Sequence, residues 1–239
     1  MKRFKIICWV LIAAGLGLAI AGMGVYGFDF NAMAADFRGE HHFVVGYATP
    51  ETTPTSVRIN IRSQNVIVRT GDDFRIDYHM NVHYSTVTNR MDGDEWVFEK
   101  SRRWAFSLFD AQPSHTWRVY VTIPANFNGP LVLDNRSGNM DIEGLTLENL
   151  TVNGRSGNIS IRNTTVRNLT IDNRSGNVNA NINTWEPNWT VANYRIDTTT
   201  RSGLVRLNGN RVGSGVQSNG TDGNIRITNR SGNINLRLT

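Results

Sequence analysis

The sequence is poor in cysteine, proline and lysine. Cys8 is the one cysteine among 239 residues, so an internal disulfide and a cysteine-based metal site are both excluded. The 6 prolines stand against 22 glycines and 28 asparagines, a composition that favours many tight turns and disfavours a helical bundle. A hydrophobic share of 39% and a charged share of 19% argue against both an intrinsically disordered chain and a multi-pass membrane protein. We therefore expect a folded domain.

Basic residues are mostly arginine, at 22 arginines against three lysines, and the formal net charge is +5. Of this excess, +3 lies in residues 1–28, and the remainder is spread over the chain rather than gathered in one segment. The arginines of the C-terminal half lie at repeated positions and lack interleaved aromatic residues, so we expect no nucleic-acid partner.

One long uncharged run occupies Ile6 to Phe28, preceded by Lys2, Arg3 and Lys5. As a helix these residues would reach about 34 Å, enough to cross a hydrocarbon core of about 30 Å. The basic flank predicts a cytoplasmic N-terminus and an extracytoplasmic remainder. We interpret residues 1–28 as a transmembrane signal-anchor. A cleaved signal peptide, with Ala32–Ala34 as the cleavage site, is the alternative, and would make the protein secreted.

Alternation of apolar and polar residues begins at Val57. We expect a linker over 29–56 and strands from Val57 onward, because apolar residues then recur at every second position in three runs, 57–61, 66–68 and 74–78. Residues 79–117 are aromatic and irregular, and we expect a hairpin or insertion there. A stretch with two tryptophans, 182–200, predicts a lateral bulge.

The strongest signal is an internal repeat of 19 residues. The motif RSGN occurs at 136–139, 155–158, 174–177 and 230–233, with RSGL at 201–204, TDGN at 221–224 and a weaker SQN at 63–65. In register, the first three units give four aliphatic columns: Leu131, Leu150 and Leu169; Leu133, Val152 and Ile171; Met140, Ile159 and Val178; Ile142, Ile161 and Ala180.

A unit of this length holds two short strands and cannot bury a face alone, so the units must stack. The fold class predicted is all-β, a single-stranded β-helix or β-solenoid over 57–239; a β-sandwich, the alternative, requires no fixed register. Glycine permits positive φ at each corner, and the following asparagine can bond to its neighbours' amides in a ladder. The predicted corner residues are Gly138, Asn139, Gly157, Asn158, Gly176, Asn177, Gly232 and Asn233.

Together, the N-terminal span, the strands over 57–78, the VYVTIP segment at 119–124 and the tandem SGN units resemble the bacterial "putative adhesin" β-strand-repeat family, domain of unknown function 4097. The resemblance covers roughly residues 57–239. It implies a membrane-anchored or exported envelope protein, in some members encoded near envelope-stress regulators. The family has no established catalytic residues, so the resemblance implies no catalytic site.

Two groups of side chains are candidate binding surfaces. Five arginines recur at the repeat position, where stacking would bring like charges close and favour a polyanion such as a wall polymer, an anionic lipid headgroup or an acidic glycan. A purely structural ladder is the alternative. Three aromatic residues of the bulge could stack on sugar rings or form a lid over the core. The two sets are Arg136, Arg155, Arg174, Arg201 and Arg230, and Trp185, Trp189 and Tyr194.

No motif predicts a catalytic, metal or cofactor site. His79 and His83 would lie about 13 Å apart on a strand, too far to share a metal ion. No histidine in the repeats can act as a base for their serines. A carbohydrate-active enzyme remains the enzymatic alternative, with Asp141, Glu143 and Glu148 as the acids to test.

We therefore expect a membrane protein of the cell envelope, with one span at 6–28 and a non-enzymatic binding, adhesin-like or scaffolding role. The partners expected are the membrane and an anionic wall polymer, a glycan or an envelope protein, with no cofactor. The alternative function is that of an envelope-stress accessory acting through a membrane partner. The sequence leaves the oligomeric state and the handedness of the coil open.

Overall fold

A computed structural model describes residues 17, 43–81, 85–102 and 118–239. Apart from Gly17, the span expected at 6–28 lies outside the described residues. Among the residues that are described, no helix is both long enough and apolar enough to cross a membrane. Most of them belong to one compact unit, Val45–His79, Val87–Ser101 and Thr116–Thr239, to which the following account refers; the few others belong to a second unit.

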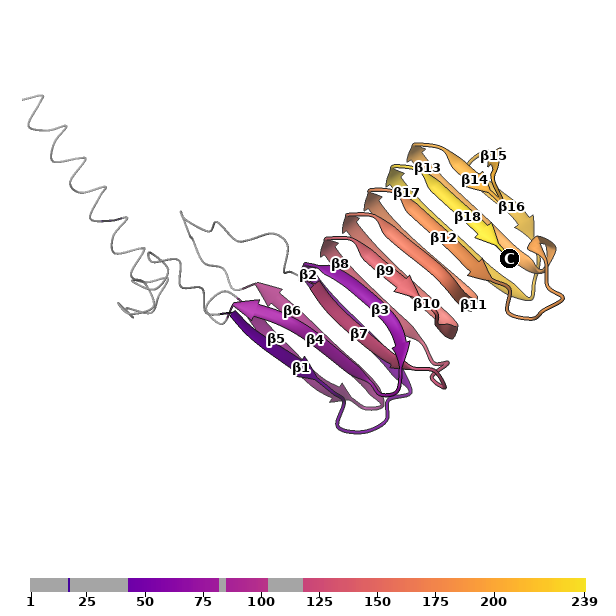
Figure 1. Cartoon of the computed structure of the whole chain (residues 1–239). Coiled ribbons are helices and arrows are strands. Elements are labelled where there is room, and N and C mark those ends of the chain that lie inside the picture. Colours follow the sequence, from indigo (N-terminus) through magenta and orange to yellow (C-terminus); the bar gives the residue numbers. More distant parts are fainter. Residues whose placement is uncertain (1–16, 18–42, 82–84, 103–117) are drawn as a thin grey trace, which may run out of the picture. The chain divides into compact units, whose positions relative to one another are not determined.

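The unit is all-β and solenoid-like, with strands arranged in two rows of parallel neighbours (Figure 1). We use the term coil for one strand of row 1 together with the strand of row 2 that follows it across a corner. Row 1 contains, in stacking order, β6 (Glu95–Arg102), β2 (Ser56–Ser63), β8 (Leu131–Ser137), β10 (Thr146–Ser156), the second half of β11 (Ile159–Ser175), β17 (Gly223–Ser231) and β13 (Tyr194–Ser202). Row 2 contains β7 (Arg118–Pro124), β3 (Asn65–Gly71), β9 (Met140–Glu143), the first half of β11, β12 (Val178–Asn183), β18 (Ile234–Leu238) and β14 (Val205–Leu207).

Antiparallel strands flank both rows. β4 (Arg75–Asn81) pairs with β7, β16 (Gly215–Asn219) with β13, and β15 (Asn210–Val212) with β14. The remaining elements are β1 (Phe43–Ala48), β5 (Ser85–Asp92) and one short 3-10 helix, η1 (Val191–Asn193).

The core lies between the rows and is built from the predicted columns. All twelve aliphatic side chains of the four columns are at most 2% exposed. Their partners in neighbouring coils are the residues 19 positions away, for example Leu131, Leu150 and Leu169. The 19-residue register is therefore confirmed, because each inward side chain packs on its equivalent above and below.

The corners explain why the motif is conserved within the chain. A Cβ on Gly157 would lie 2.2 Å from the carbonyl oxygen of Gly138, so the coils can approach only if this position is glycine. The predicted asparagine ladder is present: the Asn139 Oδ1 accepts from the Asn158 N–H at 2.9 Å, and the Asn158 Oδ1 accepts from the Asn177 N–H at 2.8 Å. The same bonds continue through Asn233 to Leu204.

The stacking order differs from the chain order. The last unit in sequence, β17 and β18, lies between β11–β12 and the earlier coil β13–β14. RSGL at 201–204 is thus the final corner of the stack and needs no asparagine, since no further corner follows. SQN at 63–65 is the corner between β2 and β3, where Gln64 replaces glycine. TDGN at 221–224 is not an equivalent corner, because it leads into the start of β17.

Three expected boundaries change. The predicted linker 29–56 contains β1, and its part before residue 43 lies outside the described residues. Of the insertion predicted over 79–117, β6 joins row 1 beside β2 and buries Trp96 and Phe98, whereas 82–84 and 103–117 lie outside the described residues. The bulge predicted over 182–200 is shorter, since β12 extends to Asn183 and β13 begins at Tyr194. The bulge is shorter because the hydrophobic residues at its two ends pack into the core of the stack.

Candidate functional site

The in-register corners place six arginines in one column on the outer side of row 1. Each arginine precedes a corner serine, and those serines pair from coil to coil, as Ser156 does with Ser137. We call this set the arginine column; in stacking order it contains Arg62, Arg136, Arg155, Arg174, Arg230 and Arg201. Arg62 was not among the predicted five, although RSQN at 62–65 differs from the repeat motif only at the glycine.

The five predicted arginines are exposed and carry unneutralised charge. Within the described residues, Arg136, Arg155, Arg174, Arg201 and Arg230 make no hydrogen bond or ion pair. Neighbouring strands lie about 4.8 Å apart, so their backbones hold like charges in a close series. Such a series is stabilised by counterions or by an anionic ligand.

A second row of polar side chains runs beside the column, two residues earlier on each strand. We call it the acid–amide row; it contains Glu99, Asn60, Asp134, Asn153, Asp172, Thr228 and Thr199 in stacking order. Acids alternate with amides as far as Asp172. The Asn153 Nδ2 donates to the Asp134 Oδ1 at 2.6 Å, so the intervening amide separates the two carboxylates and binds one of them.

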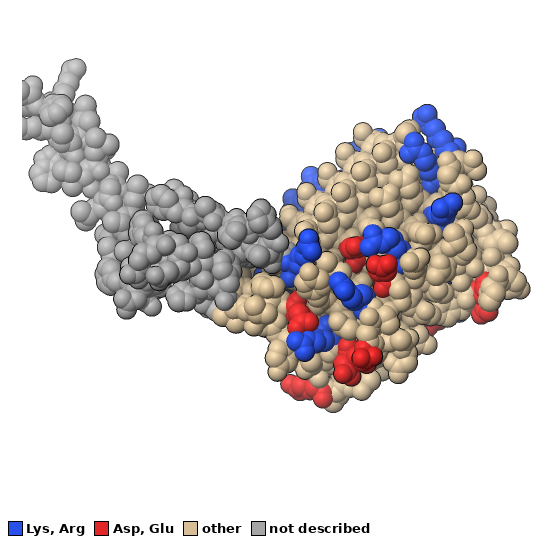
Figure 2. Space-filling view, in the orientation of Figure 1, with Lys and Arg blue, Asp and Glu red and all other residues tan. Residues whose placement is uncertain are grey.

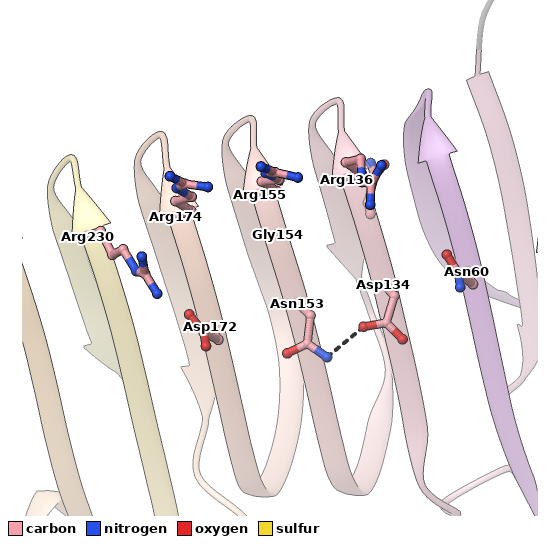
Figure 3. A pocket seen from close by; sticks show the side chains of 10 residues that line it. Asn60, Asp134, Arg136, Asn153, Gly154, Arg155, Asp172, Arg174 and Arg230 are labelled. Atoms are coloured by element: carbon pink, nitrogen blue, oxygen red, sulfur yellow. Dashed lines mark hydrogen bonds between the residues drawn. The ribbon is translucent and has the colours of Figure 1, made fainter. Parts of the chain in front are cut away.

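An open hollow of about 510 Å³ lies between the arginine column and the acid–amide row (Figure 3). Its lining includes Asp134, Asn153 and Asp172 on one side and Arg136, Arg155, Arg174 and Arg230 on the other. A second open hollow, of about 580 Å³, lies between the same arginines and the corner serines. The column is therefore a ridge that both hollows share, accessible from two sides.

One end of the first hollow continues toward Lys100. A further hollow of about 420 Å³ is lined by Asn60, Arg62, Glu99, Lys100, Ser101 and Arg136, and shares Asn60 and Arg136 with the first. Lys100 aligns with the core residue Ile61 and is 6% exposed. Burial lowers the pKa of Lys100 to about 8, because the apolar surroundings disfavour the ammonium form. No sequence signal distinguished this lysine, since its burial depends on the pairing of β6 with β2.

Comparison with known proteins identifies the family. The sequence model of the Toastrack DUF4097 family matches residues 55–239. The chain belongs to this family. No match is found among curated proteins.

The Toastrack domain also resembles solved structures. A putative cell adhesion protein from Clostridium sporogenes aligns with a TM-score of 0.57 at 12% identity, covering 83% of this chain and all of that one. A putative adhesin from Bacteroides fragilis aligns with a TM-score of 0.32 at 11% identity, over 82% of this chain and 97% of that one. The first likeness shows the fold.

Away from the column, acids and arginines do pair on both sides of the Toastrack domain. Arg162 contacts Asp141 at 2.9 Å and Glu143 at 3.2 Å. The hydrogen bond to Glu143 and the charge of Asp141 raise the pKa of Arg162. In row 1, Arg167 of β11 faces Glu148 of β10 at 3.8 Å. The three acids named for the enzymatic alternative are thus each held against an arginine.

The structure buries one of the three residues of the predicted aromatic patch. Tyr194 is fully buried; its hydroxyl accepts from the Trp185 N–H at 2.9 Å and donates to the Val166 carbonyl at 3.3 Å. Burial raises the pKa of Tyr194. Trp189 is half-buried and packs edge-on against Tyr194, with ring centroids 5.4 Å apart. Tyr194 and Trp189 thus pack on the core, as expected of a lid, and Tyr194 offers no face for a sugar ring.

The Toastrack domain holds no evident metal centre in its described part, where no three His, Cys, Asp or Glu side chains cluster. His79 lies at the end of β4, where its backbone carbonyl accepts from the Gln64 Nε2 at 3.3 Å. His41, His42, His83 and His115 lie outside the described residues.

Proposed function

We propose that this protein is a membrane-anchored, extracytoplasmic binding module of the cell envelope, with an adhesin-like and non-enzymatic role, whose arginine column binds an anionic wall polymer. In this proposal residues 6–28 cross the membrane and the Toastrack domain lies outside. The observation that carries the proposal is that five exposed arginines of the column, Arg136, Arg155, Arg174, Arg230 and Arg201, have no ion-pair partner among the described residues and are flanked by two open hollows. Figure 2 shows basic side chains on one face of the domain alongside acidic ones.

A contrast within the domain supports a ligand-binding role for the column. On the row 2 side, Arg162 is neutralised by two acids from the neighbouring coil. In the column, the five arginines other than Arg62 form no ion pair with the acids two positions away or with any other described residue. A polyanion would supply the missing partners, and arginine is well suited to it because the guanidinium group binds phosphate and carboxylate in a bidentate manner.

Co-sedimentation of the full chain in detergent with purified cell walls tests the proposal. We expect binding that weakens with added salt and disappears once the anionic polymers are removed from the walls. Arg155→Gln together with Arg174→Gln should reduce binding at least tenfold. Arg206→Gln with Arg237→Gln removes the same charge from the row 2 side and should leave binding nearly unchanged.

Equal binding by both double variants would show that overall charge, rather than the column, holds the polymer. No binding to either wall preparation would instead favour the alternative, an envelope-stress accessory that acts through a membrane partner. In that case, exchange of residues 6–28 for a plain Leu/Ala helix should abolish the cellular phenotype.

A further inference from the structure

The arginine column and the acid–amide row together form a surface of two parallel lines of opposite charge. Residues two positions apart on a strand have backbones about 6.6 Å apart, so the lines are close. Nevertheless Asp134 and Asp172 form no ion pair with an arginine among the described residues, although Arg136 and Arg174 lie next to them in the hollow. Figure 3 shows the arginines near the corners and the acids further down the same strands.

Ion pairs of this type do form elsewhere in the same domain. Arg162 reaches both Asp141 and Glu143, which lie one coil away. If Asp134 and Asp172 served only to neutralise the arginines of the column, they should form ion pairs with them, as Asp141 and Glu143 do with Arg162. The acids instead line the hollow from the side opposite the arginines, where they can contact whatever occupies it.

A ligand with negative charge alone would fit this hollow poorly. Its anionic groups, once bound to Arg155 and Arg174, would lie near the carboxylates of Asp134 and Asp172 and be repelled by them. A ligand that also carries ammonium groups would satisfy both lines of charge, with primary amines donating to the carboxylates. The hollow thus discriminates by charge pattern as well as by net charge.

The spacing of the acids sets the pattern expected of such a ligand. Asp134 and Asp172 are two coils apart, with Asn153 between them, which corresponds to about 9.6 Å. The hollow runs from the coil of Asn60 to the coil of Arg230, a span of four coil steps. A linear chain fits a surface of this length better than a single small group.

We infer that the hollow between the arginine column and the acid–amide row selects a linear polymer that carries both phosphate groups and primary amines. The phosphates bind Arg136, Arg155, Arg174 and Arg230, and the ammonium groups bind Asp134 and Asp172. This inference rests on the proposed function, because it assigns the chemical class of polymer to the same surface.

The test compares two forms of one probe, a glycerol phosphate polymer bearing alanyl esters and the same polymer after N-acetylation. Acetylation removes the positive charges and leaves the phosphates in place. Binding of the full chain in detergent is measured at pH 6, where the amines are charged. We expect the wild type to bind the amine form at least fivefold more tightly than the acetylated form.

Two double variants test whether the preference for the amine form of the probe depends on the two carboxylates of the acid–amide row. Asp134→Asn with Asp172→Asn retains the shape of both side chains and an acceptor for Asn153, and should bring the ratio of the two affinities close to one. Asp72→Asn with Asp73→Asn, on the exposed loop between β3 and β4, removes equal charge and should retain the fivefold preference. Thermal unfolding confirms that the variants are folded.

The outcomes separate the two proposals. Equal affinity of the wild type for both probes, together with weaker binding by Arg155→Gln/Arg174→Gln, would overturn the inference and support the arginine column as a plain polyanion site. Failure of that arginine variant to weaken binding of either probe would overturn the proposed function and the inference with it. Competition by free phosphoethanolamine at the same concentration of charged groups would overturn the linear-polymer assignment.

Discussion

At the scale of single residues, the corner glycines determine how closely the coils approach. Gly157 has a φ of 136°, and a Cβ there would meet the Gly138 carbonyl oxygen at 2.2 Å. The obstacle is backbone, which cannot move aside without separating two coils. Conformational freedom and close approach are therefore both required at this position.

A comparison of Gly157→Ala with Gly215→Ala should separate the effect of positive φ from that of the close approach of the coils. Gly215 has a similar φ of 122°, but no atom lies within 4 Å of its built Cβ. We expect Gly157→Ala to lower the free energy of unfolding by about 2 kcal/mol more than Gly215→Ala does. Urea denaturation measures both. Equal losses would show that backbone strain alone makes glycine necessary.

Lys100 predicts a pH dependence of stability. Its pKa of about 8 in the folded protein lies below the ordinary lysine value of 10.5, so between these values the unfolded chain binds more protons than the folded chain. The contribution of this group to stability must therefore rise as the pH increases from about 8 to about 10.5. Lys100→Met should remove this rise, so its stability relative to the wild type should be greatest at pH 7 and fall toward pH 10.5.

Thermal unfolding of the wild type and Lys100→Met from pH 7 to pH 10.5 measures the effect. The melting temperatures should differ most at pH 7 and converge toward pH 10.5. A constant difference over this range would contradict the lowered pKa of Lys100.

At the scale of the strand and its corner, backbone pairing is supplemented by side chains that bond to the next coil. The asparagine after each corner glycine accepts from a backbone N–H of its neighbour, and the bond recurs at 2.8 to 2.9 Å along the stack. A side chain thus completes the hydrogen bonding of a corner that the strands leave open.

Asn158→Ala tests this role of the corner asparagine. It leaves the Asn177 N–H without its partner and should cost about 1 kcal/mol of stability. Asn235→Ala is the control, since the bond it removes joins two side chains and leaves every backbone group with its partner, and it should cost less than about 0.5 kcal/mol. The reverse ranking in urea denaturation would show that the ladder does not stabilise the corners.

At the scale of the whole Toastrack domain, the last two strands of the chain, β17 and β18, lie inside the stack rather than at its end. Ile225 and Ile227 of β17 pair with Leu169 and Ile171 on one side and with Ile196 and Thr198 on the other. The segment between β14 and β17 connects the final coil of the stack to this position between β11 and β13. Removal of β17 and β18 would expose apolar residues on both sides of the gap.

Truncation after residue 222 should therefore abolish the cooperative unfolding of the whole domain. In a solenoid stacked in chain order, the same truncation would remove one terminal unit and leave the rest folded. Far-UV circular dichroism during heating distinguishes these cases. Addition of a synthetic peptide of residues 221–239 should restore the transition; a truncated chain that unfolds with the wild-type transition would contradict the buried position of β17.

The sequence by itself determined the repeat, the inward columns, the corner residues and five arginines of the column, because in-register stacking transmits a 19-residue period directly to every coil. Only the tertiary structure decided which coils are neighbours. Strands pair with whatever edge is free, irrespective of distance along the chain, and so β17 lies beside β11 and β6 lies beside β2. The burial of Lys100 and Tyr194, and the alternation of acids and amides beside the arginines, follow from those pairings.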